Sequence, residues 1–377
     1  MLQRTAQTEE HHALRETTRK LIEHHAMPNL ARWEDAGIID REFFRLCGEA
    51  GLFGMSISEA DGGLGLDFSY DAVVSEEFAY AGVHVTVLLQ SVILLPYIID
   101  YGTEEQKQKY ARPLIDGSMI GAIAMTEPGT GSDVQAIRTS ARRDGDFYII
   151  NGSKTYISNG QNCDMVIVAA KTAPGKGSRG ISLFIVDADT PGFQRGRNLD
   201  KIGQWSGDTS ELFFEDVKVP ATNLLGPEHG GFGCLMGELV QERLSIAVNA
   251  QAAAQRAFDV ALDYTKNRPA FGKTVFDFQN TRFTLADLAS QLQVGWAHLD
   301  WAVARHVEGA LTPREASAAK YWHTEILWKI VDAALQLHGG AGYMNEFEIA
   351  RIWRDARVQR IYGGTSEIML EIIGRDL

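Results

Sequence analysis

The stretch Thr126-Glu127-Pro128-Gly129-Thr130-Gly131-Ser132-Asp133 lies where the sequence changes from helical to β-strand character. Glycines permit tight turns and close backbone approach, and successive backbone N–H groups can bind an anion or a carbonyl oxygen. The segment after it is predicted to be a β-hairpin and not a helix, which excludes a dinucleotide-binding fingerprint. Taken alone, the stretch is most simply interpreted as a plain turn.

Hydrophobic periodicity divides the chain into three zones around this stretch. Apolar residues recur at helical spacing before Met119, short β-rich runs separated by turn signals fill Gly121 to Pro220, and the helical period returns after Gly231. We therefore predict an α+β multi-domain protein with a helical, a β and a second helical domain. The predicted domains are residues 1–120, 121–228 and 229–377.

The strands and helices expected in the last two zones can be named. Strands without helices between them favour an antiparallel sheet or barrel. The predicted strands are Phe147–Ile150, Met165–Ala169, Ile181–Val186 and Leu212–Phe214. The predicted C-terminal helices are Leu239–Thr265, Phe283–Val307, Arg314–Leu337, Glu346–Arg357 and Ser366–Gly374.

Composition limits the class of protein. The 377 residues carry 36 Lys and Arg against 49 Asp and Glu, and the net charge of −13 argues against a nucleic-acid-binding protein. Three separated cysteines make no disulfide framework, which favours a reducing compartment. The N-terminus shows neither a secretory signal nor a transit peptide, and Val85–Ile99 is predicted to be a buried helix and not a membrane span. A cytoplasmic, most simply bacterial, protein is expected.

Three further segments are candidates for binding. Tyr156 and Ser158 share a strand face, where a planar cofactor can stack on the ring and accept a hydrogen bond from the hydroxyl. Arg268 to Lys273 forms a loop between two long helices that suits a phosphate contact. Ile361–Ile368 is a glycine loop that enters a helix N-terminus, where free N–H groups can receive a negative group. A strand pair, a solvated loop and simple helix capping are the plain alternatives.

Paired histidines raise the question of a metal site. Adjacent helical residues face different directions, so each histidine would need a partner one turn away. Arg15 and Glu16 stand four residues after His11 and His12, and Lys20 and Leu21 stand four residues before His24 and His25. Solvated helix faces are the simpler interpretation, and no metal is expected.

Together, these segments resemble the acyl-CoA dehydrogenase family, in the family's order and over nearly the whole chain. The resemblance implies a helical N-terminal domain, a middle β-barrel, a C-terminal four-helix bundle, a homotetramer and noncovalently bound FAD. The matching segments are Met125–Asp133, Asn151–Lys154, Arg268 with Phe271–Lys273, Gln336–Gly340 and Tyr362–Glu367.

The resemblance also assigns roles to residues. Tyr156 would pack on the isoalloxazine and Ser158 would bond near N5, while Ser132, Arg243 and Gly364 would contact acyl-CoA. The loops around Arg268 and after Gln336 would reach the FAD of a neighbouring subunit. The cofactor-binding residues it implies are Met125, Thr126, Gly131, Ser132, Tyr156, Ile157, Ser158, Arg268, Phe271, Phe278, Gln279, Gln336, Leu337, Gly339, Gly340, Thr365 and Glu367.

One departure from the family pattern concerns the catalytic base. Many members carry a Glu directly after the loop tyrosine, where this chain has Gly363. A branch that includes long-chain and isovaleryl-CoA dehydrogenases has its base on the first long C-terminal helix, in a motif resembling Gln241–Leu244. The resemblance therefore implies Glu242 as base, with the backbone N–H of Gly363 still available to the thioester oxygen.

The implied reaction is FAD-dependent α,β-dehydrogenation of a fatty acyl-CoA, with electrons passed to an electron-transfer flavoprotein. Two alternatives stay open, a flavin oxidase or monooxygenase and a flavin- or CoA-binding pseudoenzyme on the same fold. Straight, branched and terpenoid acyl groups are all compatible with the sequence.

Overall fold

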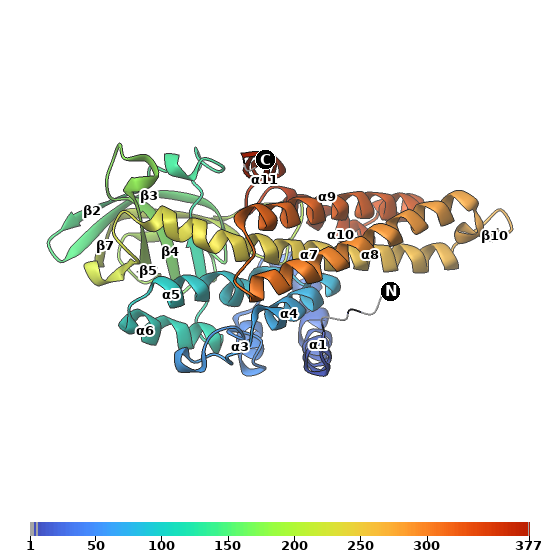
Figure 1. Cartoon of the computed structure of the whole chain (residues 1–377), viewed down its shortest axis with the longest axis horizontal. Coiled ribbons are helices and arrows are strands. Elements are labelled where there is room, and N and C mark those ends of the chain that lie inside the picture. Colours follow the sequence, from blue (N-terminus) through green and yellow to red (C-terminus); the bar gives the residue numbers. More distant parts are fainter. Residues whose placement is uncertain (1–3, 5–6, 376) are drawn as a thin grey trace.

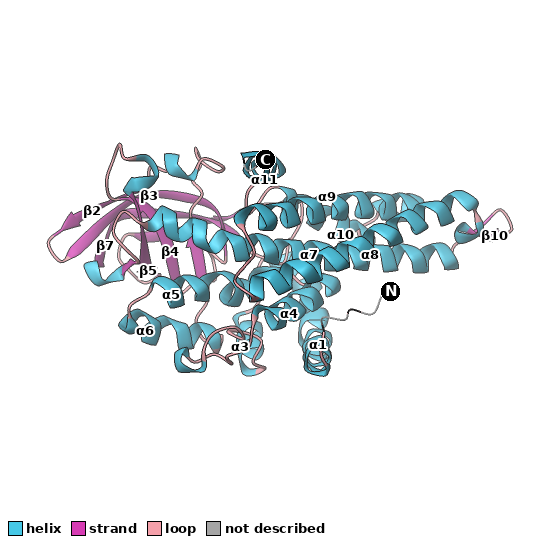
Figure 2. Cartoon of the chain, in the orientation of Figure 1, coloured by secondary structure: helices cyan, strands magenta, loops and turns pink. Residues whose placement is uncertain are grey.

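The computed structural model describes residues 4, 7–375 and 377. Strands gather at one end of the molecule, the N-terminal helices lie beside them, and three long C-terminal helices extend to the other end (Figures 1 and 2). The predicted order of helical, β and helical zones is therefore confirmed. No helix in the described part of the chain is long and apolar enough to cross a membrane.

The N-terminal zone is built from short helices. Thr8 caps the first of them through a capping box with His11, which is buried, stacks on Tyr70 and bonds Ser69 Oγ at 2.8 Å. The predicted solvated face is therefore wrong for His11. The helices are α1 (Glu9–Leu21), α2 (Leu30–Ala36), α3 (Arg41–Glu49), α4 (Phe68–Ala81), α5 (Leu95–Tyr101) and α6 (Glu104–Ile115).

The prediction of a single helix over the apolar run Val85–Ile99 is wrong. The run forms a 3₁₀ turn, a π-helical turn (Gln90–Leu94) and the start of α5. Two of its polar residues, Gln90 and Ser91, lie in the π-helical turn and bond groups outside the segment. The Gln90 amide donates to Met119 O and accepts from Gly121 N, and Ser91 Oγ accepts from Gly54 N. These bonds fasten the segment to the first strand and to the loop after α3.

The middle zone forms one eight-stranded sheet in the order β6-β7-β3-β2-β4-β5-β8, with β1 added on β4. Most neighbours are antiparallel, but β1 and β2 both pair with β4 in parallel, which corrects the wholly antiparallel prediction. Among the described strands no ladder joins β6 to β8, so the predicted barrel is not closed by hydrogen bonds. The strands are β1 (Gly121–Ala124), β2 (Ser140–Asp144), β3 (Phe147–Ser158), β4 (Met165–Lys171), β5 (Ile181–Asp187), β6 (Phe193–Asn198), β7 (Thr209–Pro220) and β8 (Leu224–Leu225).

Strand β4 is apolar on both faces because both are covered. Met165 and Ile167 belong to the core shared with α5 and α6, whereas Val166 and Val168 belong to the core on the other side of the sheet. A continuous hydrophobic run is the pattern expected of a strand buried in this way.

The C-terminal zone contains the five predicted helices. Small residues such as Ala254 and Ala257 on α7 let α9 pack closely through Leu327 and Val331. The helices are α7 (Gly231–Asn267), α8 (Gln279–Val307), α9 (Pro313–His338), α10 (Glu348–Ala356) and α11 (Ser366–Arg375), and a short hairpin, β9 (Pro269–Ala270) and β10 (Lys273–Thr274), joins α7 to α8.

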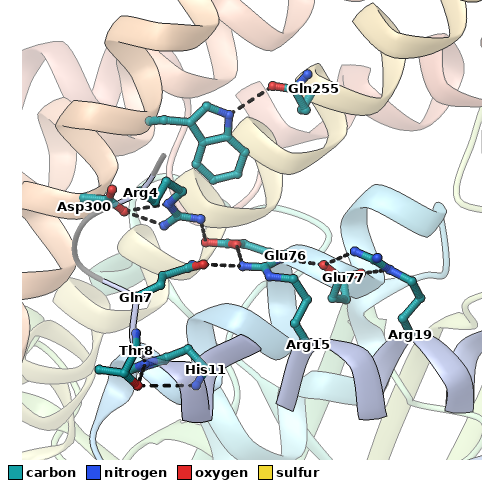
Figure 3. A network of polar contacts seen from close by, with 11 residues as sticks. Arg4, Gln7, Thr8, His11, Arg15, Arg19, Glu76, Glu77, Gln255 and Asp300 are labelled. Carbon is teal, nitrogen blue, oxygen red and sulfur yellow. Dashed lines mark hydrogen bonds and ion pairs between the residues drawn. The ribbon is translucent and has the colours of Figure 1, made fainter. Parts of the chain in front are cut away.

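An ion-pair network connects the first and last zones (Figure 3). Arg4 bonds both Glu76 on α4, at 2.6 Å, and Asp300 on α8, at 2.9 Å. Arg15 on α1 bonds the second oxygen of Glu76 at 2.6 Å and also bonds Glu77. The two buried glutamates are therefore compensated, and α1, α4 and α8 are held together.

Candidate active site

The centre of the site is the carboxyl group of Glu242 on α7. It is buried, and its Oε1 accepts a hydrogen bond of 2.9 Å from the hydroxyl of Tyr97 on α5. Burial raises the pKa of Glu242 to about 7, against the opposing influences of the Tyr97 bond and the Arg243 charge. A carboxyl group with such a pKa can take up or release a proton near neutral pH.

Two buried cations lie between α7 and α9. Arg243 Nη1 donates to Ser317 Oγ at 3.3 Å, and its buried Nε has no partner among the described residues. Lys320 Nζ donates to Gly364 O at 2.5 Å, and burial lowers its pKa to about 8. These charges favour a polar or anionic group beside the glycine loop that contains Gly364. Sequence reasoning missed Lys320, although a lysine within an alanine-rich helical stretch is an available signal.

The glycine loop lies over the helix face that carries the carboxyl group. Gly363 has φ +63°, and a Cβ built there would lie 2.4 Å from Cδ1 of Ile246. Because residues four apart share a helix face, Ile246 is the neighbour of Glu242 one turn along α7. Gly363 therefore lies against α7 one turn from Glu242, and Gly364 is joined to α9 through Lys320.

A buried ion pair joins two of the sequence motifs in the β domain. Lys154 Nζ lies 2.9 Å from Glu127 Oε1 and also bonds Met125 O at 3.0 Å. Glu127 in turn accepts the backbone N–H groups of Arg138 and Thr139. These bonds hold the loop that begins at Met125 against β3. Both charged residues stand inside the quoted motifs, but their pairing was not foreseen.

The loop and the neighbouring strand present an open face. Tyr156 sits at a bulge in β3 with φ +61° and is 68% exposed, whereas Ile157 is buried. A Cβ at Gly129 or Gly131 would meet no atom within 4 Å. An exposed aromatic ring beside an uncrowded glycine loop fits the flat ring system of a flavin.

A second group of predicted residues lies at the far end of the molecule. Phe271, on the β9–β10 hairpin, is 96% exposed, and the hairpin is at the end opposite β3 (Figure 1). The end of α9 is beside it, because His338 stacks on Tyr264 near the end of α7, with ring centroids 4.2 Å apart. Within one chain, this group therefore lies at the other end of the molecule from the β domain that carries Tyr156. Its predicted members are Arg268, Phe271, Phe278, Gln279, Gln336, Leu337, Gly339 and Gly340.

At the start of α11, Thr365 Oγ1 accepts the backbone N–H of Ile368 at 3.3 Å, and Glu367 is exposed. Thr365 is therefore a helix cap, as in the plain interpretation, at a helix N-terminus that follows directly on Gly364.

The fold and this site define the acyl-CoA dehydrogenase class of flavoproteins. Family models for the N-terminal, middle and C-terminal domains of acyl-CoA dehydrogenase match residues 8–118, 122–217 and 229–377. The chain belongs to the acyl-CoA dehydrogenase family and is an oxidoreductase whose cofactor is FAD.

Individual relatives agree with this assignment. The pig (Sus scrofa) mitochondrial long-chain specific acyl-CoA dehydrogenase is 47% identical over 98% of this chain and 86% of its own. The caffeyl-CoA reductase-Etf complex subunit CarC of Acetobacterium woodii is 39% identical over 90% of each.

Solved structures give the same result. An acyl-CoA dehydrogenase from Geobacillus kaustophilus has a TM-score of 0.97 at 47% identity and covers 99% of both chains. A Mycobacterium smegmatis glutaryl-CoA dehydrogenase in complex with FADH2 has a TM-score of 0.92 at 28% identity, with 98% of this chain and 95% of that chain covered.

Proposed function

We propose that the protein oxidises a fatty acyl-CoA thioester to the trans-2-enoyl-CoA, with Glu242 as the base that removes the α proton. The observation that carries this proposal is a buried carboxyl group with a pKa of about 7 on the helix face beneath the Gly363 loop. When bound, FAD accepts the β hydrogen as a hydride. The 47% identity to a long-chain specific relative supports a long acyl chain.

The chain's own groups suit the charge changes of this reaction. Enolisation places negative charge on the thioester oxygen, and preorganised donors stabilise it most in a site that excludes water. The backbone N–H of Gly363 is one such donor in our proposal. Arg243 and Lys320 add positive charge beside the Gly363–Gly364 loop. In our proposal the polar thioester and CoA portion of the substrate lie there.

The positions of the flavin-contact residues support a homo-oligomer. The β9–β10 hairpin, which carries Phe271, lies at the end of the molecule opposite the β sheet that carries Tyr156, so in our proposal Phe271 reaches a flavin on Tyr156 from a second subunit. We propose a homotetramer with an electron-transfer flavoprotein as acceptor. The name of the CarC relative, an Etf-complex subunit, supports that acceptor.

The test is anaerobic bleaching of the bound flavin by a panel of straight and branched acyl-CoAs. We expect bleaching by at least one long-chain member, and we expect Glu242→Gln to keep FAD but lose bleaching by a factor of about 10² or more. Near-normal bleaching by Glu242→Gln would refute the assignment of the base. Hydrogen peroxide formation in air would favour an oxidase, and an inert flavin with every acyl-CoA would favour a pseudoenzyme.

A further inference from the structure

The contact between Tyr97 and Glu242 joins two parts of the chain that are 145 residues apart. Tyr97 is fully buried on α5, and its hydroxyl donates to Oε1 of the carboxylate. Within the part of the chain that the structure describes, this is the one hydrogen bond that Glu242 accepts. The second oxygen, Oε2, therefore has no hydrogen-bond donor among the described residues.

This arrangement has two physical consequences for a base. A donor fixed to one oxygen restricts rotation of the carboxylate, so that the other oxygen has a defined direction. A hydrogen bond to a charged carboxylate also stabilises the ionised form, which burial alone disfavours. Burial and two nearby carboxylates raise the pKa of Tyr97 above its usual value, so the hydroxyl stays a donor throughout the working pH range.

Resting on the function proposed above, we propose that Tyr97 is a positioning residue for the base, holding Oε1 of Glu242 so that Oε2 receives the α proton. The role is distinct from general packing, because removal of the hydroxyl changes both the orientation and the ionisation of one carboxyl group. The titratable and charged groups that face this carboxyl group or its immediate partners are Tyr97, Asp100 and Tyr101 on α5, Glu238 and Arg243 on α7, and Lys320 on α9.

The test uses the FAD-loaded Tyr97→Phe protein. The rate of anaerobic flavin bleaching is measured against pH, with the acyl-CoA that bleaches the wild type fastest. We expect the limiting rate to fall by roughly tenfold to a hundredfold. We also expect the midpoint of the rising limb to move up by about one pH unit, because the ionised form loses its donor.

A matched control is Tyr110→Phe. Tyr110, on α6, is also buried and donates to a carboxylate, Asp187 at the end of β5, at 3.0 Å, and neither residue is among the groups that shift the pKa of Glu242. The Tyr110→Phe variant loses the same kind of hydrogen bond. We expect the pH midpoint and the limiting rate of its flavin bleaching to stay at the wild-type values. A shift in Tyr110→Phe equal to that in Tyr97→Phe would show a general stability effect and overturn the proposal.

Other outcomes separate this proposal from the proposed function. A Tyr97→Phe profile identical to the wild type, together with an inert Glu242→Gln protein, overturns the positioning role alone. Bleaching by Glu242→Gln instead overturns the base itself. If Tyr97→Phe is recovered without FAD, the Tyr97→Met variant, which also lacks the hydroxyl donor, replaces it. Its limiting bleaching rate and pH midpoint are then compared with those of the wild type.

Discussion

Gly363 and Ile246 are in such close contact that a Cβ at position 363 would lie 2.4 Å from Ile246 Cδ1. A side chain at this loop position, where many family members carry the base, would therefore have to displace the end of the Ile246 side chain. Glu242, on the same helix face as Ile246, supplies the carboxyl group instead.

Substituting Gly363 by Ala should destabilise the protein. Its φ of +63° is unfavourable for an L-residue by about 1–2 kcal/mol, and the new methyl group must displace Ile246. We expect the thermal midpoint of the FAD-loaded protein to fall by about 2–5 °C. Gly374→Ala is the control, since Gly374 lies in α11 with open space around it, and alanine is favoured there. Equal midpoints for the two variants would contradict the prediction.

Glu242→Gln should be more stable than the wild type at alkaline pH. The pKa of Glu242 is raised from 4.5 to about 7 by burial, so folding favours its protonated form. The contribution of this group to the free energy of unfolding is therefore complete below the unfolded pKa of 4.5 and is lost as the pH rises through about 7. The loss is about 3 kcal/mol at most. Thermal melts at pH 8 should show the variant melting higher, and the difference should shrink as the pH approaches 4.5. An unchanged difference across this range would contradict it.

Glu238 should act on the base in the direction opposite to Tyr97. It lies one turn before Glu242 on α7, and burial with the charge of Asp100 raises its own pKa to about 7. Its negative charge disfavours ionisation of Glu242, so Glu238→Gln should move the midpoint of the bleaching profile down, by up to about one pH unit. Glu371→Gln, on α11 beside Arg375, is the control and should leave the midpoint in place. An upward shift in Glu238→Gln would be inconsistent with this electrostatic relationship.

Regular elements were predictable where local signals and packing agree. The Gly- and Pro-free stretch Leu239–Thr265 lies inside α7, as its composition predicts. Val85–Ile99 has a helical appearance but is not one helix, and Gln90 and Ser91 in its π-helical turn bond groups outside the segment. The parallel pairing of β1 with β4 joins segments about 40 residues apart, which strand periodicity does not specify.

The residues proposed for the site can be named from the sequence, but the groups that contact them cannot. Motifs that resemble the family point to Glu242 and Gly363. Tyr97 stands in an apolar run and gains its meaning only from a contact 145 residues away. Lys154 and Glu127 were quoted as parts of two motifs, but their pairing depends on how the loop folds onto β3.

The buried pair of Lys154 and Glu127 leads to a prediction about cofactor binding. Both side chains are nearly or completely buried, so Lys154→Met leaves the Glu127 charge with backbone donors only. Breaking a buried pair by removing one partner typically costs about 3–5 kcal/mol. We therefore expect a thermal midpoint several degrees lower and loss of FAD on gel filtration, because the Met125 carbonyl also loses its donor.

Two further variants separate charge from position in this effect. Lys329→Met is the matched control, because the Lys329–Asp287 pair is exposed, at 52% and 58%, and such pairs contribute about 0–1 kcal/mol. The double variant Lys154→Met with Glu127→Gln removes the unpaired charge and should regain part of the lost stability. It should still bind FAD weakly, because neither new side chain restores the bond from residue 154 to the Met125 carbonyl. Full FAD retention in Lys154→Met would show that the loop keeps its position without the pair.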